Sequence, residues 1–87
     1  MCNTNMLEKI REAIENTTDE TLLSRTVYLK IFCGLANKHS YFSQKEIAEY
    51  LSFSPSRVGY YIREHSNMLS NTEYKKLCQE VETKVIS

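Results

Sequence analysis

Nine polar side chains in the middle of the chain are of types that donate hydrogen bonds to anions. Four lie between residues 38 and 45 and five between residues 54 and 63; they are Lys38, Ser43, Gln44, Lys45, Ser54, Ser56, Arg57, Tyr60 and Arg63. Such groups bind phosphate oxygens, and arginine can also pair with guanine through two parallel hydrogen bonds. Their chemistry is that of nucleic-acid recognition, provided that the fold holds them on one surface.

Two short helices joined by a tight turn, over residues 43–65, are predicted to position these side chains. Ser43 and Glu46 have the spacing of a capping box, in which the hydroxyl and the carboxylate each accept a hydrogen bond from the other residue's backbone N–H. Phe42 and Ile47 flank this cap as a hydrophobic staple, which fixes the angle at which the chain enters the first helix.

The second helix has a different start signal. Ser54 is a good N-cap, and Pro55 follows at the first helical position, where its missing N–H and fixed φ do no harm. Only Leu51 or Ser52 through Phe53 remain for the turn. The apolar residues of the unit fall where two steeply crossing helices would face each other: Ile47, Ala48, Leu51, Phe53, Val58, Tyr61 and Ile62.

This pattern resembles the helix-turn-helix family of DNA-binding units over about 20 residues. The family has a small residue at the Ala48 position, a glycine in the turn and a β-branched residue at the Val58 position. This chain departs from it at Ser52, which stands where glycine is usual. A left-handed conformation at Ser52 would cost about 1 kcal/mol relative to glycine, which a well-packed unit can tolerate.

Helix-period apolar spacing through the rest of the chain predicts an all-α fold, a single domain of four or five helices over residues 1–87. A first helix over residues 5–16 begins at the cap pair Asn5 and Glu8. Its apolar stripe contains Met6, Leu7, Ile10, Ala13 and Ile14. That stripe either closes the core of the domain or forms the surface of a homodimer, a common device by which small DNA-binding domains gain affinity.

Two further helices are predicted on either side of the helix-turn-helix. One begins at Thr18 or Asp19, runs to about Lys38, and is apolar around most of its circumference, so it belongs in the middle of the domain. Gly34 within it predicts a close helix crossing. The other begins at a second capping box, Ser70 with Glu73, and carries an apolar stripe of Tyr74, Leu77, Cys78, Val81 and Val85.

Charge is distributed unevenly although the formal net charge is zero. Residues 1–24 hold five acidic and two basic side chains, residues 25–65 hold three acidic and six basic ones, and residues 66–87 hold three of each. The positive segment coincides with the predicted helix-turn-helix, as expected for a local DNA footprint. Because the surplus is only three charges, one copy should bind weakly and in a salt-sensitive way.

A longer resemblance covers residues 25–85. Three parts of the chain carry this resemblance: the helix ending at Leu35-Ala36, the segment Tyr41-Phe42-Ser43 leading to Ile47-Ala48, and the tail His65-Ser66-Asn67-Met68-Leu69 through Tyr74, Leu77 and Val81. The order of these elements resembles the C-terminal DNA-binding domain of the bacterial replication initiator DnaA, a Trp-repressor-like fold. The family reads DNA with an Arg-Asp-His-Thr-Thr-Val type signature. Here the corresponding residues are Ser54-Pro55-Ser56-Arg57-Val58, and the interval from Ile47 to Val58 is one residue shorter. The family's base contacts therefore do not transfer. The resemblance implies a fold and a DNA-facing helix but not origin recognition.

The sequence argues against catalysis and against a bound metal or cofactor. His39 and His65 are the only imidazoles, neither has a cysteine or carboxylate at ligand spacing, and no glycine-rich phosphate loop is present. His65 is expected near a helix C-terminus, where its cationic form would be favoured.

No run approaches the roughly 20 apolar residues of a membrane span, and the polar first residues do not form a signal peptide. We therefore expect a cytoplasmic protein with no membrane partner.

The functional prediction is a small bacterial-type regulatory or accessory protein that binds double-stranded DNA in the major groove. Ser54, Ser56, Arg57, Tyr60 and Arg63 are the candidate residues for base edges. Lys38, Ser43, Gln44 and Lys45 are the candidates for backbone phosphates. Two alternatives stay open: a helix pair in a small bundle with solvated arginines, and a protein-interaction module in which Tyr60, Tyr61 and Arg63 anchor a protein partner. A role in replication and a role in transcription are equally compatible with the pattern.

Overall fold

A computed structural model describes residues 4–39 and 43–86, with side chains for residues 6–38 and 43–85. These residues form five α-helices and one short 3-10 helix and contain no strand, which confirms the all-α prediction. In chain order the elements are α1 (Thr4–Thr18), η1 (Leu22–Ser24), α2 (Thr26–His39), α3 (Gln44–Leu51), α4 (Pro55–Met68) and α5 (Thr72–Ile86). The predicted cap at Asn5 and the predicted staple residue Phe42 lie outside the described side chains.

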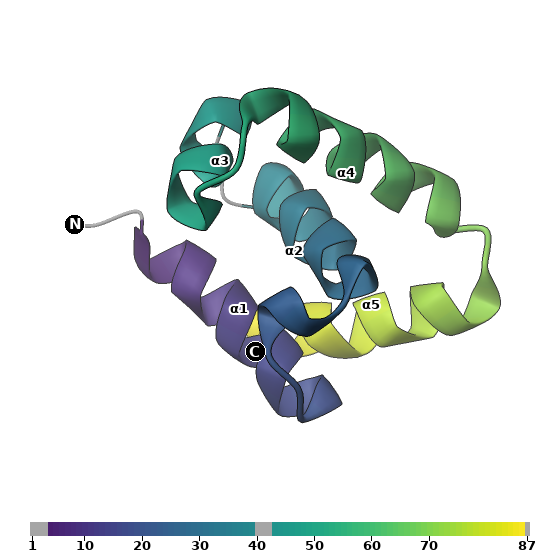
Figure 1. Cartoon of the computed structure of the whole chain (residues 1–87). Coiled ribbons are helices and arrows are strands. Elements are labelled where there is room, and N and C mark those ends of the chain that lie inside the picture. The colour runs from purple at the N-terminus through teal and green to yellow at the C-terminus, as the bar shows by residue number, and fades with distance from the viewer. Residues whose placement is uncertain (1–3, 40–42, 87) are drawn as a thin grey trace.

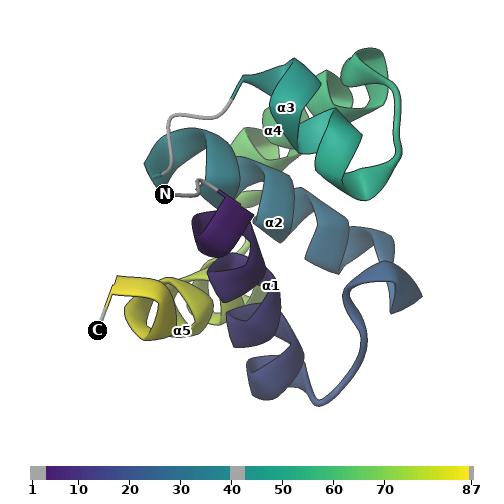
Figure 2. The ribbon, with the colours of Figure 1, turned by 90° about the vertical axis from the view of Figure 1, so that its left-hand side faces the viewer.

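The helix α2 lies in the middle of the molecule, as its apolar circumference predicts. Both views place α3 and α4 on one side of α2 and α1 and α5 on the other (Figure 1, Figure 2). Ile31, Phe32, Cys33 and Ala36 of α2 are completely buried between these layers. The burial of apolar side chains on both sides of α2 therefore fixes the position of α4, the helix that carries most of the candidate binding residues.

The apolar stripe of α1 belongs to the core of the same chain. Leu7, Ile10, Ala13 and Ile14 are buried, and Met6 packs against the core. The interpretation of this stripe as a dimer surface is therefore wrong, because the intramolecular packing of α1 already removes it from solvent. The alternative that the sequence left open, a helix that closes the core, is confirmed.

The connection between α1 and α2 differs from the prediction. Asp19, predicted to start the second helix, has φ = 60° and ends the first one instead, because its N–H donates to the Glu15 carbonyl at 2.8 Å. The Glu15 carboxylate then accepts a hydrogen bond from the Leu22 N–H at 3.0 Å, at the start of η1. As a result α2 begins only at Thr26, and Asp19 and Glu20 lie outside its first turn. Aspartate favours both N-caps and left-handed helix ends, so the local sequence allowed either role.

The connection between α4 and α5 is also capped by a different residue than predicted. The Asn71 side chain, through Oδ1, accepts a hydrogen bond from the Tyr74 N–H at 3.0 Å and so caps α5. Ser70 lies outside this cap: its hydroxyl donates to the carbonyl of Asn67, in the last turn of α4, at 3.2 Å. Asparagine and serine are comparable N-caps, which explains the shift of one residue.

Cys33 and Cys78 are buried and pack as small apolar residues. Burial raises the pKa of the Cys33 thiol to about 12 and that of the Cys78 thiol to about 11, so both thiols stay protonated at neutral pH. None of the helices in the described part of the chain has the length and apolar character that crossing a membrane requires.

Candidate nucleic-acid interface

The start of α3 is built as the sequence predicts. The Glu46 N–H donates to the Ser43 hydroxyl at 3.2 Å, and the Ser43 N–H donates to the Glu46 carboxylate at 3.0 Å. This capping box satisfies two backbone donors that a free helix end would leave unpaired. It also fixes the exposed residues Ser43, Gln44 and Lys45 at one end of a helix whose Ile47 and Ala48 are buried.

The turn between α3 and α4 is formed by residues 52–54. Ser52 has φ = 64° and ψ = 38°, the left-handed conformation for which the family pattern uses glycine. The Phe53 N–H donates to the Ala48 carbonyl at 2.9 Å and closes the end of α3. Ser54 then caps α4, because its hydroxyl accepts from the Arg57 N–H at 3.2 Å, with Pro55 at the first helical position. The predicted turn and start of α4 are therefore confirmed.

Between residues 55 and 63 the helix α4 has a buried inner face and an exposed outer face. Val58 and Tyr61 are buried against α2 and α3, as predicted, and Ile62 is partly buried. The outer face is exposed and carries Ser56, Arg57, Tyr60 and Arg63. Tyr60 is 48% exposed, which is unusual for so large an aromatic side chain. The predicted division of α4 into core and surface residues is thus correct.

The first turn of α3 lies beside the middle of α4. A Cβ atom added at Gly59 would lie 3.1 Å from the amide group of the Gln44 side chain, so the two helices meet there. This contact places Gln44 beside α4. The exposed polar candidates of α3, the turn and α4 are together called the α3/α4 face; its members are Ser43, Gln44, Lys45, Ser54, Ser56, Arg57, Tyr60 and Arg63.

Arg57 is held in place by two aromatic side chains, Phe53 and Tyr61, that were not candidates for DNA contact; Tyr61, predicted as an anchor for a protein partner, is buried instead. Its guanidinium carbon lies 3.9 Å from the centre of the Phe53 ring, and its Nε–H donates to the Tyr61 hydroxyl at 3.1 Å. The guanidinium is therefore oriented before any partner binds, and its terminal N–H groups remain available. The spacing of Phe53, Arg57 and Tyr61, four residues apart each time, was the signal that could have revealed this arrangement.

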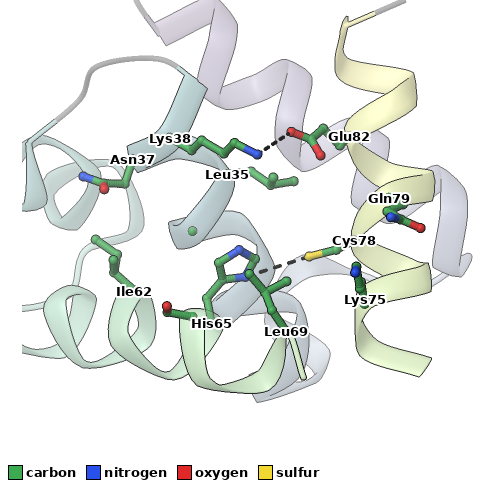
Figure 3. A pocket seen from close by; sticks show the side chains of 12 residues that line it. Leu35, Asn37, Lys38, Ile62, His65, Leu69, Lys75, Cys78, Gln79 and Glu82 are labelled. Carbon is green, nitrogen blue, oxygen red and sulfur yellow. Dashed lines mark hydrogen bonds and ion pairs between the residues drawn. The ribbon is translucent and has the colours of Figure 1, made fainter. Parts of the chain in front are cut away.

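Lys38 does not join the α3/α4 face, in contrast to the prediction. Its ammonium group forms an ion pair with Glu82 of α5 at 3.2 Å (Figure 3). Two other basic residues of the positive segment are also paired: Arg25 with Glu20 at 3.3 Å and Lys30 with Glu64 at 3.8 Å.

Two of these carboxylates, Glu20 and Glu82, come from outside residues 25–65 and reduce the positive surplus of that segment, whereas Glu64 belongs to the segment itself. The remaining cations of that segment are Lys45, Arg57 and Arg63, and all three belong to the α3/α4 face. The basic surface is smaller than the charge count predicted, but it is confined to the face that carries the other candidate residues.

His65 contradicts its predicted role. Although it lies in the last turn of α4, its ring packs against Gly34 of α2, and its Nδ1 lies 2.7 Å from the Tyr74 hydroxyl and 3.8 Å from the Cys78 sulfur. Burial is the main cause that lowers the pKa of His65, and the nearby Lys38 lowers it further. The cationic form is disfavoured here, because desolvation outweighs the favourable effect of the helix C-terminus. Gly34, by contrast, provides the close helix crossing that the sequence predicted.

Comparison with known proteins adds no assignment. No family model matches the chain, and neither a curated protein nor a solved structure shows significant similarity to it.

Proposed function

We propose that this protein binds double-stranded DNA through α3, the turn and α4, used as a helix-turn-helix with α4 in the major groove. The observation that carries the proposal is the α3/α4 face: exposed donors from two helices lie together, and the guanidinium of Arg57 is held ready over Phe53. A recognition helix contacts base edges through the residues of its N-terminal half. Arg57 and Tyr60 occupy that half of α4, and Arg63 lies three residues after Tyr60.

Two groups of residues have different roles in this proposal. Arg57 and Arg63 face base edges, where an arginine can donate two hydrogen bonds to one guanine, and Tyr60 contacts a thymine methyl group or a phosphate. Ser43, Gln44 and Lys45 at the start of α3, with Ser54 and Ser56, contact backbone phosphates on the flank of the groove. Lys38 has no role, because it is paired with Glu82 away from this face.

The modest charge of the α3/α4 face leads to a quantitative expectation. Each phosphate contact contributes about −0.9 to the slope of log K against log salt, so a face with Lys45 and two arginines should have a shallow slope of roughly −2 to −3. Affinity of a single copy should then be weak at physiological salt.

The test is selection from a pool of random duplex DNA at low and moderate salt. We expect the native chain to enrich a shared sequence, and Arg57→Ala to lose that enrichment with an affinity reduced about tenfold or more. Lys76→Ala is the matched control, because it removes the same charge from an exposed position of α5, on the far side of the molecule. Absence of binding by the native chain even at low salt would refute the proposal.

A protein partner for the same α3/α4 face is the second candidate function. It is favoured by the pairing of Arg25, Lys30 and Lys38 with carboxylates, which leaves little positive potential around the face. Exposed tyrosine and arginine side chains such as Tyr60 and Arg63 are also the residues that dominate protein interfaces. Binding that persists with little change as salt rises, and that needs no DNA, would favour this candidate over the first.

A further inference from the structure

A cleft of about 450 Å³ lies where α2, α4 and α5 meet, away from the residues of the α3/α4 face (Figure 3). Leu35 of α2, Ile62 of α4 and Leu69, which directly follows α4, supply apolar lining, and Leu69 is 40% exposed. Small-molecule sites are typically about 300–1,000 Å³ in volume and mostly apolar, with a few polar groups that fix orientation. This cleft, which we call the α2/α4/α5 cleft, has that size and composition.

The polar group inside the cleft is the imidazole of His65. Figure 3 shows this ring extending from α4 into the space between α2 and α5, facing Cys78. Nδ1 of His65 lies 2.7 Å from the Tyr74 hydroxyl, and burial raises the pKa of Tyr74, so this hydroxyl keeps a proton that it can donate. When the Tyr74 hydroxyl donates to Nδ1, the single N–H of a neutral imidazole lies on Nε2. In this tautomer the cleft contains a hydrogen-bond donor on a ring that Tyr74 orients.

The charged groups that line the cleft are two lysines and one glutamate. Lys38 of α2 and Glu82 of α5 form an ion pair that bridges the cleft at one end. Lys75 of α5 also lines the cleft and is exposed, and it takes part in none of the ion pairs found among the described residues. With His65 neutral, the lining has two positive charges and one negative charge. A bound group that neutralises Lys75 must be negative.

We propose that the α2/α4/α5 cleft binds a small organic anion, a molecule with a compact apolar body and one carboxylate. The body packs against Leu35, Ile62 and Leu69, and the carboxylate pairs with Lys75 and accepts from Nε2–H of His65. A metal ion is a poorer occupant, because no three metal-binding side chains converge in the part of the chain that the structure describes. This proposal does not depend on DNA binding by the α3/α4 face.

The test uses 2-naphthoate as the probe and 2-naphthamide as its neutral counterpart, followed by proton–nitrogen correlation NMR of the full chain. We expect 2-naphthoate at concentrations up to about 5 mM, the range of a weak fragment, to shift the amide signals of cleft residues and the Nε2 signal of His65. The amide should bind more weakly. Lys75→Gln should weaken 2-naphthoate binding about two- to five-fold, the range of an exposed ion pair, whereas Lys76→Gln, one residue along and outside the lining, should leave it unchanged.

Three results would overturn the proposal. The first is no saturable shift at the cleft residues, or shifts that map elsewhere, such as around the exposed Leu23 of η1. The second is equal affinity for 2-naphthoate and 2-naphthamide, which would remove the role of the anion. The third is an equal loss of affinity for 2-naphthoate in Lys75→Gln and Lys76→Gln. That result would show that the net charge of the protein, and not the position of Lys75 in the cleft, governs binding. Both lysines are exposed, so neither variant is expected to impair folding.

Discussion

The two halves of α4 differ in what their polar side chains contact. In the first half Ser56 and Tyr60 are exposed to solvent, and Arg57 rests on the surface of the Phe53 ring. In the second half His65 is enclosed by α2 and α5 and is hydrogen-bonded to Tyr74. One helix therefore presents polar groups to a partner at one end and uses a polar group for packing at the other. Substitutions in the first half should alter binding, and substitutions in the second should alter stability.

The largest expected effect on stability distinguishes two glycines. Gly59 lies within the first half of α4, and Gly34 of α2 packs against His65 in the second half. Gly34→Ala adds a Cβ that would overlap the His65 ring, so the free energy of unfolding should fall by about 1–3 kcal/mol. Gly59→Ala adds a Cβ 3.1 Å from the flexible end of Gln44, which can move aside. The better helix propensity of alanine should then keep that variant within about 1 kcal/mol of the native chain. Urea denaturation measures both, and equal losses would contradict the comparison.

The next effect compares two tyrosines. Tyr74→Phe removes the hydroxyl that pairs with Nδ1 of His65 and leaves a buried acceptor without its donor, which should cost about 1–2 kcal/mol of stability. Tyr60→Phe removes an exposed hydroxyl from the first half of α4 and should change stability by less than about 0.5 kcal/mol. Thermal unfolding of the pair checks the difference. A loss in Tyr60→Phe as large as that in Tyr74→Phe would show that the two halves are not distinct.

The third prediction concerns pH and the second half of α4 alone. Since the folded chain lowers the pKa of His65, the unfolded chain binds the proton more readily. The stability that comes from keeping His65 neutral is therefore fully present above the pKa of His65 in the unfolded chain, about 6.5. It is lost as pH falls from there toward the lower pKa of His65 in the folded chain. The free energy of unfolding should decrease between about pH 7 and pH 5 in the native chain. In His65→Gln this decrease should be smaller, with His39 as the remaining histidine; an unchanged slope would contradict the assignment.

A smaller effect on stability than those of Gly34→Ala and Tyr74→Phe is expected at Arg57. Because its stacking on Phe53 is at the surface, Arg57→Ala should lower the free energy of unfolding by only about 0.5–1 kcal/mol. The same variant should show the largest loss of DNA binding. Arg57→Lys refines the point, because it keeps the charge but not the planar group that stacks and donates in two directions. Circular dichroism melts measure the stability, and a cooperative loss of structure in Arg57→Ala would show that Arg57 is chiefly structural.

Much of the α3/α4 face could be read from the sequence because its signals are local. The capping box of Ser43 and Glu46, and the Ser54-Pro55 start of α4, operate within one helical turn, so residue types at fixed spacing are sufficient. The same holds for the alternation that buries Val58 and Tyr61 and exposes Tyr60. Local signals fail only where two residues or two roles compete, as at Asp19 and at Asn71.

Only the tertiary structure decided which residues that are far apart in the chain contact each other. The ion pair of Lys38 with Glu82 removes a predicted phosphate contact, and no local rule could place α5 beside the end of α2. The packing of His65 against Gly34 disfavours the cationic form that the helix C-terminus favours, since desolvation depends on neighbours from other helices. Hydrophobic periodicity determined which residues form helices and which face of each is buried. The packing of those helices decided which charges stay available for a partner, because electrostatics depends on distance in space.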